Sequence, residues 1–186
     1  MVKATFAIGM ALGAMAAADA TKINFINQCG YNVDLQHVQG GSQIARLSNI
    51  APGTAYAYYA NGPAHMFRHG YGDQATLAEF SIPGDGKAWY DISIIPPGPG
   101  QCRSYEDCKG ATGRKGFNVP MNIAPKQNAN GRNCRQLVCP ADDKWACADA
   151  YHFPADTKTH DCPDWTEFDV VFCPGGPGGN GGGGVK

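Results

Sequence analysis

The segment TLAEFSIPGDGKAWYDIS, residues 76–93, decides the fold prediction for this chain. Apolar and polar residues alternate on both sides of its centre, PGDGK at 83–87. A period of two is typical of strands that bury one face, and glycine and proline between two such runs are typical of a turn. The segment therefore predicts an antiparallel hairpin.

A five-residue connection gives this hairpin a nearly continuous apolar face. A slip by one residue would turn all of these side chains to the opposite face, so burial of the apolar side selects this register. The same register sets Glu79 directly opposite Asp91 on the other face. The pairs on the apolar face are Thr76–Ile94, Ala78–Ile92, Phe80–Tyr90 and Ile82–Ala88.

Two facing carboxylates are an unusual choice for a sheet. Directly opposed residues have Cβ atoms about 4.5–5.5 Å apart, and like charges at that spacing destabilise the pair. Each acid should raise the pKa of the other. Glycoside hydrolases use such pairs, and such pairs also bind cations or sugar hydroxyls. The alternative is that Lys87, Arg68 or another cation neutralises Glu79 and Asp91, and the sequence leaves both interpretations open.

The remaining sequence predicts further short strands punctuated by glycine and proline. Residues 23–35 indicate two strands joined by a turn at Cys29-Gly30, and residues 166–173 a final strand. No segment before residue 120 shows a helical period. Residues 96–115 form a loop-like insert with its own cysteine pair. We therefore predict an all-β fold, a sandwich or a barrel of antiparallel strands.

The two ends of the chain are expected to lie outside the folded domain. Residues 1–20 show a lysine, an apolar run and an A-x-A site, the pattern of a secretory signal peptide. The mature chain, a single domain over residues 21–174, is then exported, and no later segment is apolar over the length of a bilayer span. Residues 175–186 are a glycine-rich tail that we expect to be disordered.

Charge and cysteine content exclude several classes of function. The formal net charge of −1 offers no electrostatic basis for binding nucleic acid or anionic lipid. Eight cysteines in an exported chain indicate four disulfides. No C-x-x-C pair occurs, and His65 and His69 lie in GPAHMFRHGYG, which we interpret as a loop with surface histidines. We expect no metal and no cofactor.

Five motifs in this chain resemble the thaumatin-like proteins, in that family's order. The resemblance spans residues 23–174 and implies a β-sandwich facing a disulfide-rich second domain across an acidic cleft. Most of that second domain is missing, because only a short stretch separates Cys139 from Cys147. The insert at 96–115 is not a family feature. The motifs are TLAEF at 76–80, WYDIS at 89–93, GFNVPM at 116–121, CADAYHFPAD at 147–156 and FDVVFCP at 168–174.

The resemblance also implies a disulfide pairing, which the sequence alone could not select. Three bridges follow the family's pattern, and the remaining two cysteines then bond within the insert. The implied pairs are Cys29–Cys173, Cys134–Cys162, Cys139–Cys147 and Cys102–Cys108.

The family's cleft is built from one arginine and four acids. Glu79 and Asp91 fall on two of the acids, and Asp156 on a third, with Asp149 as its rival. Tyr58 stands at the position of the arginine.

The fourth acid of the family's cleft is replaced in this chain. Either Lys115 or Pro96 stands at its position, depending on how the insert is counted. Arg68, in the neighbouring loop, would supply the lost positive charge.

The resemblance implies a secreted defence or wall-associated protein. Because many family members bind β-1,3-glucans, it also implies β-1,3-glucan as the ligand. We expect Glu79 and Asp91 to accept hydrogen bonds from sugar hydroxyls, and Trp89, Tyr90 or Tyr58 to offer a stacking face. If the chain hydrolyses glucan, the two acids are its catalytic pair, at the closer, retaining separation of about 5 Å. We expect binding rather than catalysis.

A second interpretation is a disulfide-stabilised effector or enzyme inhibitor that acts through protein–protein contact. The insert would then be a recognition loop, and we expect the chain to be a monomer. The residues at the tip of that loop would be Arg103, Tyr105, Glu106 and Asp107.

Overall fold

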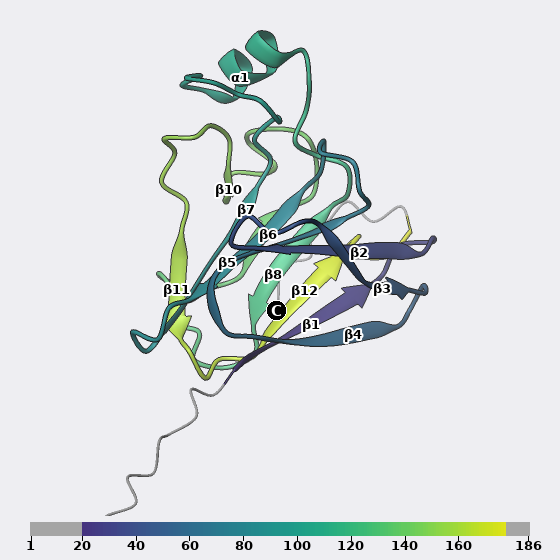
Figure 1. Ribbon diagram of the computed structural model, residues 1–186, viewed down its shortest axis with the longest axis vertical. Helices are drawn as coiled ribbons and strands as arrows, with labels where there is room; N and C mark the ends of the chain where they lie inside the picture. Colours follow the sequence, from purple (N-terminus) through teal and green to yellow (C-terminus); the bar gives the residue numbers. More distant parts are fainter. Residues whose placement is uncertain (1–19, 178–186) are drawn as a thin grey trace, which may run out of the picture.

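The computed structural model describes residues 20–177. All but the last residue of the predicted signal peptide lies outside these residues, as does the tail from residue 178 onward. The described chain folds into two β-sheets, with one short helix at the end of the molecule that is uppermost in Figure 1.

The first sheet has five strands in the order β4-β1-β12-β8-β9. Its two central strands, β1 and β12, run parallel although they come from opposite ends of the described chain. The other neighbours in this sheet are antiparallel. The strands are β1 (Thr21–Asn27), β4 (Ala55–Ala60), β8 (Met121–Pro125), β9 (Leu137–Cys139) and β12 (Phe168–Phe172).

The second sheet has the order β10-β7-β6-β5-β2-β3, and β11 also pairs with β7. Only the short β10 runs parallel to its neighbour. The strands are β2 (Val33–Gln39), β3 (Ala45–Ile50), β5 (Gly62–His69), β6 (Leu77–Ile82), β7 (Lys87–Ser93), β10 (Ala150–Tyr151) and β11 (His160–Pro163).

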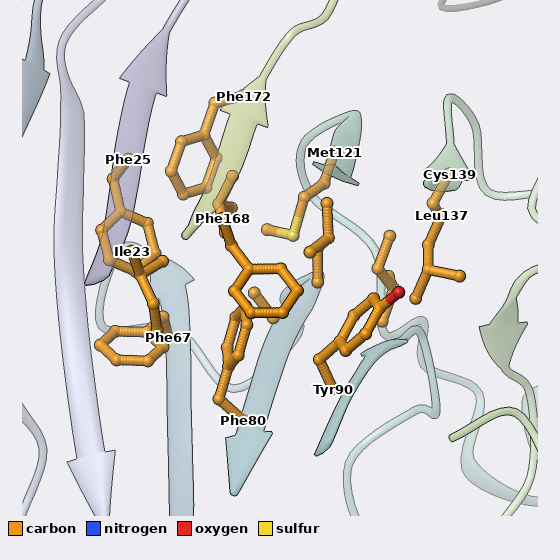
Figure 2. Close-up of a cluster of buried hydrophobic side chains, with 14 of the residues drawn as sticks. Ile23, Phe25, Phe67, Phe80, Tyr90, Met121, Leu137, Cys139, Phe168 and Phe172 are labelled. Carbon is orange, nitrogen blue, oxygen red and sulfur yellow. The ribbon is translucent and has the colours of Figure 1, made fainter. Parts of the chain in front are cut away.

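The core lies between the inner faces of the two sheets. Strand β1 alternates buried and half-buried residues along its whole length, as a strand with one covered face must. Figure 2 shows Phe25 and Phe168 of the first sheet meeting Phe67, Phe80 and Tyr90 of the second. Burial of each such ring stabilises the fold by about 1.5–3 kcal/mol. The predicted all-β sandwich is confirmed.

The central hairpin has the predicted register. Phe80 pairs with Tyr90 and Ala78 with Ile92 on the buried face, while Glu79 pairs with Asp91. This agreement shows that burial of the apolar side was sufficient to set the pairing.

Four disulfides join the same cysteine pairs that the resemblance implies. They link Cys29 to Cys173, Cys102 to Cys108, Cys134 to Cys162 and Cys139 to Cys147. The first closes a loop of 144 residues, for which chain-entropy arithmetic gives about 4–5 kcal/mol of stabilisation.

The two strands predicted over residues 23–35 are present as β1 and β2, although they belong to different sheets. Two other expectations about local structure were wrong. His65 and His69 lie on strand β5 rather than in a loop, and His65 is buried, with its ring stacked on that of His37. The insert is not purely loop-like, since it contains the helix α1 (Tyr105–Thr112).

Candidate ligand-binding cleft

A row of side chains crosses three strands of the second sheet on the face away from the core. Met66 of β5 pairs with Glu79 of β6, and Glu79 pairs with Asp91 of β7. Each of these residues alternates with a buried neighbour, Phe67, Phe80 and Tyr90 respectively, so the buried side of the hairpin fixes what the outer side displays.

This row is the floor of a cleft of about 460 Å³. Glu79 and Asp91 lie on the floor, and Trp89 of β7 lies beside them. Tyr151 of β10 and Pro154, in the segment that follows β10, line it as well. The volume lies in the range of sites that bind small molecules or a few sugar rings. Ala64, His65, Met66, Phe80, Ser81, Ile95 and Thr159 complete the lining.

The two acids on the floor are paired with each other and with no cation. Neither Glu79 nor Asp91 forms an ion pair with any described lysine, arginine or histidine, whereas Lys87 pairs with Asp161 at 3.3 Å. They are directly opposed across the β6–β7 ladder, where each acid affects the pKa of the other. The structure therefore does not show the neutralisation by Lys87 or Arg68 that the sequence left open.

Burial changes the protonation of this pair. It raises the pKa of both acids, and for Asp91 burial and the Glu79 charge together raise the pKa to about 8. Two adjacent half-buried carboxylates cannot both ionise cheaply, so the pair retains one proton that Asp91 shares with Glu79. Asp91 Oδ1 is buried and has no hydrogen-bond partner.

Two aromatic rings of the cleft are held by polar contacts. The Trp89 indole donates its Nε1–H to Asp85 Oδ2 at 3.1 Å, and Lys87 Nζ lies 4.7 Å from the centre of the ring. The Tyr151 hydroxyl lies 2.5 Å from Thr159 Oγ1. Rings fixed in this way can stack on a sugar without a large loss of side-chain entropy.

Arg68 belongs to strand β5, not to a neighbouring loop. Its Nη2 donates to the Tyr71 carbonyl at 2.9 Å, it forms no ion pair with any described residue, and burial lowers its pKa. It does not line the cleft. The structure therefore does not bring Arg68 into contact with Glu79 or Asp91.

Neither Asp156 nor its rival Asp149 lines the cleft. Asp156 accepts a hydrogen bond from the His152 backbone N–H at 3.2 Å, and its carboxylate lies 3.8 Å from His152 Nδ1. Asp149 pairs with Arg135 at 2.7 Å. Both acids are occupied in holding the segment that follows β9.

Two of the three expected stacking residues also lie elsewhere. Tyr58 is on β4 of the first sheet, where its ring packs against those of His37 and Phe67. Tyr90 is 1% exposed and donates its hydroxyl to the Arg135 carbonyl at 2.6 Å. Only Trp89 of the three lines the cleft.

Sequence reasoning did not single out Tyr151, Pro154 and Ile95. Tyr151 and Pro154 belong to the quoted motif CADAYHFPAD, so the signal was present, but only the acid of that motif was considered. Lys115, a candidate for the position of the fourth acid, lines a separate hollow of about 420 Å³ next to α1. Pro96, the other candidate, does not line the cleft.

The insert is docked rather than projecting freely. Ser104 caps the N-terminus of α1, and Gly113 ends it in the left-handed conformation. The Tyr105 hydroxyl donates to the Asp142 carbonyl at 2.5 Å, and Glu106 pairs with Lys144. Of the four residues expected at the tip of a recognition loop, Tyr105 and Glu106 therefore anchor the insert to the Cys139–Cys147 loop.

Among residues 20–177, no three histidine, cysteine or acidic side chains gather as a set of metal ligands. Nor does this part of the chain contain a helix that is long and apolar enough to cross a membrane.

Comparison with known proteins identifies relatives of this chain, although no family model matches it. It is 28% identical over 182 residues to a thaumatin-like pathogenesis-related protein 4 from Avena sativa, and the match covers 86% of this chain and 90% of the relative. It is 33% identical over 94 residues to a glucan endo-1,3-beta-glucosidase from Prunus avium, covering 50% of this chain and 30% of the relative.

Among solved structures, the fold is similar to that of the thaumatin-like xylanase inhibitor TLXI. The TM-score is 0.53 at 17% identity, and the match covers 82% of this chain and 99% of the inhibitor. At this identity the likeness concerns the fold alone.

Fold and cleft together define the class: a disulfide-braced β-sandwich with an acidic cleft on its larger sheet. Within that class, the relatives and the fold of this chain support its membership of the thaumatin-like family. It is a short form, with only a small lobe between Cys139 and Cys147.

Proposed function

We propose that this chain is a secreted, defence-type thaumatin-like protein that binds β-1,3-glucan of a cell wall in the cleft over Glu79 and Asp91. One observation carries the proposal. Two acids without a cation partner lie on the floor of a cleft of about 460 Å³ that Trp89 and Tyr151 also line.

The chemistry of the cleft suits a neutral polyol. A carboxylate accepts hydrogen bonds from sugar hydroxyls, and hydrogen bonds to charged groups contribute about 1.5–3 kcal/mol each. The apolar ring faces of Trp89 and Tyr151 complement the C–H faces of a pyranose.

Binding makes fewer demands on this cleft than hydrolysis. Hydrolysis needs the two carboxyl groups at a set separation, about 5–5.5 Å in retaining glycosidases and about 6.5–9.5 Å in inverting ones. Binding needs hydrogen-bond acceptors and an apolar ring face, which Glu79, Asp91 and Trp89 supply. We therefore propose a glucan-binding protein.

The relatives support both the ligand and the location. One local match is to a protein named for endo-1,3-glucan hydrolysis, and a match over most of the chain is to a pathogenesis-related protein. Four disulfides suit an oxidising extracellular environment. Together with the predicted signal peptide, they support secretion.

The test is retention on insoluble β-1,3-glucan. We expect the wild-type chain to be retained, and Glu79→Gln/Asp91→Asn to bind at least about tenfold more weakly, because the acid pair loses its negative charge. Glu167→Gln, the same chemical change at a half-buried acid that pairs with Lys22, is the matched control and should be retained like the wild type. Equal retention of wild type and double variant, or retention of neither, would exclude the proposal.

A second candidate function is inhibition of an extracellular enzyme by protein–protein contact. The observation in its favour is Trp145, which is 79% exposed on the loop that the Cys139–Cys147 disulfide closes. The pair Lys144–Glu106 ties this loop to α1. A rigid, exposed tryptophan is a typical hot-spot anchor, and the fold is shared with a xylanase inhibitor.

This candidate predicts that the chain lowers the activity of a xylanase and that Trp145→Ala weakens the effect at least about thirtyfold, the loss of one hot-spot residue. Trp165→Ala is the control, because Trp165 is also exposed, at 65%, but lies outside the Cys139–Cys147 loop. The readout is residual xylanase activity against inhibitor concentration. An unchanged inhibition curve for Trp145→Ala, or no inhibition by the wild type, would count against this function.

A further inference from the structure

Strand β4 is an unprotected edge of the first sheet. It pairs with β1 on one side only, and its sequence AYAYYA has no charged residue, no proline and no glycine. Natural proteins protect such edges with charges, prolines, bulges or very short strands, because an open edge is a template for another strand.

The other edge strands of the described chain are all protected. Strands β9 and β10 have three and two residues. Strand β11 carries Asp161 and Pro163. Strand β3 carries Arg46, and its pairing with β2 contains a bulge. Only β4 combines six residues, a regular register and a complete lack of charge.

Alternate residues of β4 direct their backbone groups outward. The Asn27 N–H donates to the Thr54 carbonyl at 3.0 Å, which fixes the phase of the β1–β4 ladder. Tyr56 and Tyr58 then bond to β1, and Ala55, Ala57 and Tyr59 face away from it. All three of these residues are exposed, Tyr59 at 62%. No described turn, loop or side-chain hydrogen bond reaches their backbone groups.

We propose that a second copy of this chain docks on this edge, strand β4 against strand β4 in antiparallel orientation about a two-fold axis at Ala57. The occupant must be an extended strand, because unpaired N–H and C=O groups are what the edge offers. This proposal replaces the expectation of a monomer and does not depend on the proposed glucan site.

A copy of β4 is complementary to β4 in this register. Ala57 faces Ala57 of the copy, and Ala55 faces Tyr59 twice, once on each side of the axis. These three hydrogen-bonded pairs make about six backbone hydrogen bonds. Between them Tyr56 faces Tyr58, an aromatic pair on the other face of the strand. With no charge in the strand, the contact brings no like charges together. A single pair of strands buries less than a standard interface of about 1,200–2,000 Å², which makes the dimer a transient one.

The test is sedimentation equilibrium of the full chain from about 10 μM to 1 mM, the range in which a small interface associates. We expect the average mass of the wild type to rise from one chain towards two. Ala57→Lys should keep the mass of one chain, because two like charges then face each other on the axis. Ala111→Lys places the same charge on an exposed residue of α1 and should behave like the wild type.

Mixing gives a sharper result. Ala57→Glu alone should also stay monomeric, whereas an equimolar mixture of Ala57→Lys and Ala57→Glu should dimerise, because opposite charges meet at the axis. A wild type that keeps the mass of one chain throughout would overturn the proposal. Dimerisation of Ala57→Lys to the wild-type extent would also overturn it, because the interface would then lie elsewhere.

A readout on the wild type covers the case in which the variants unfold. The amide protons of Ala55, Ala57 and Tyr59 should exchange more slowly as protein concentration rises, while those of Tyr56 and Tyr58 should not change with concentration. Exchange of the first three amides that is independent of concentration would overturn the proposal.

Discussion

Glu79 and Asp91 place two acids at positions where a sheet usually avoids them. The apolar partners Phe80 and Tyr90 fix the register, and the acids must then face each other. Both are half-buried and lack a cation partner, so the native state relieves their repulsion by retaining a proton. The two acids that we propose as acceptors for sugar hydroxyls thus reduce the stability of the fold at neutral pH.

This cost predicts a pH-dependent effect of Asp91→Asn. An ordinary aspartate in the unfolded chain has a pKa near 3.9, whereas burial and Glu79 raise the pKa of Asp91 in the folded state to about 8. Between these values the native state binds more protons than the unfolded state, so wild-type stability falls as pH rises. The amide does not ionise, and the variant should therefore gain melting temperature relative to the wild type from pH 4 to pH 8.

The control for this prediction is Asp73→Asn. Asp73 is exposed and pairs with Arg114. The melting temperature of Asp73→Asn should therefore stay close to that of the wild type over the same pH range. Thermal melts at one-unit pH intervals measure both variants. If the difference in melting temperature between Asp91→Asn and the wild type stays constant or shrinks towards pH 8, the pKa of Asp91 is not raised.

For individual residues, the sequence was sufficient to predict that Glu79 and Asp91 face each other, but not to place the other residues of the cleft. Their opposition follows from a period of two within 18 residues. Whether Asp156 or Tyr58 reaches the same cleft depends on the path of a long segment and on the sheet that a strand joins. Neither property is encoded in local alternation.

Helix α1 shows how an element escapes sequence analysis. It has only eight residues, including Gly110, and isolated helices of this length are unstable in water. It exists because Ser104 caps it, the Cys102–Cys108 disulfide closes it, and Tyr105 binds Asp142. All three contributions depend on a residue outside the helix, namely Ser104, Cys102 or Asp142.

Strand β5 was interpreted as a loop although it is a strand. Gly62 and Pro63 at its start favour a loop interpretation, yet the chain pairs with both β2 and β6. An irregularity between Gly62 and His65 absorbs these residues, and Ala64 adopts a positive φ of 60° there. Tertiary pairing outweighs the local turn signals, which is the usual reason why strand propensity fails.

For the whole molecule, the sequence predicts the β-sandwich but not the order and direction of its strands. Many short alternating strands in a cysteine-rich chain favour two packed sheets. The parallel pairing of β1 with β12 joins residues 145 apart, such as Ile23 and Phe168. No local pattern specifies such a contact, although the Cys29–Cys173 bridge implied by the resemblance brings the same two strands together.

The cleft is also a property of the whole molecule. Its floor is the outer face of β6 and β7, whereas Tyr151 and Pro154 come from a segment that β10 and the Cys134–Cys162 disulfide hold against that sheet. The short form keeps this part of the lobe, and with it a lined hollow above the two acids.

The most direct test of the central claim is a carbon-detected NMR titration of the Glu79 and Asp91 carboxyl groups, with and without a soluble β-1,3-gluco-oligosaccharide. One of the two carboxyl groups should titrate near pH 8 in the free protein. Its midpoint should fall when the sugar is added, because hydroxyl donors favour the ionised form. Ordinary midpoints for both acids, unmoved by the oligosaccharide while Asp73 serves as reference, would contradict the account.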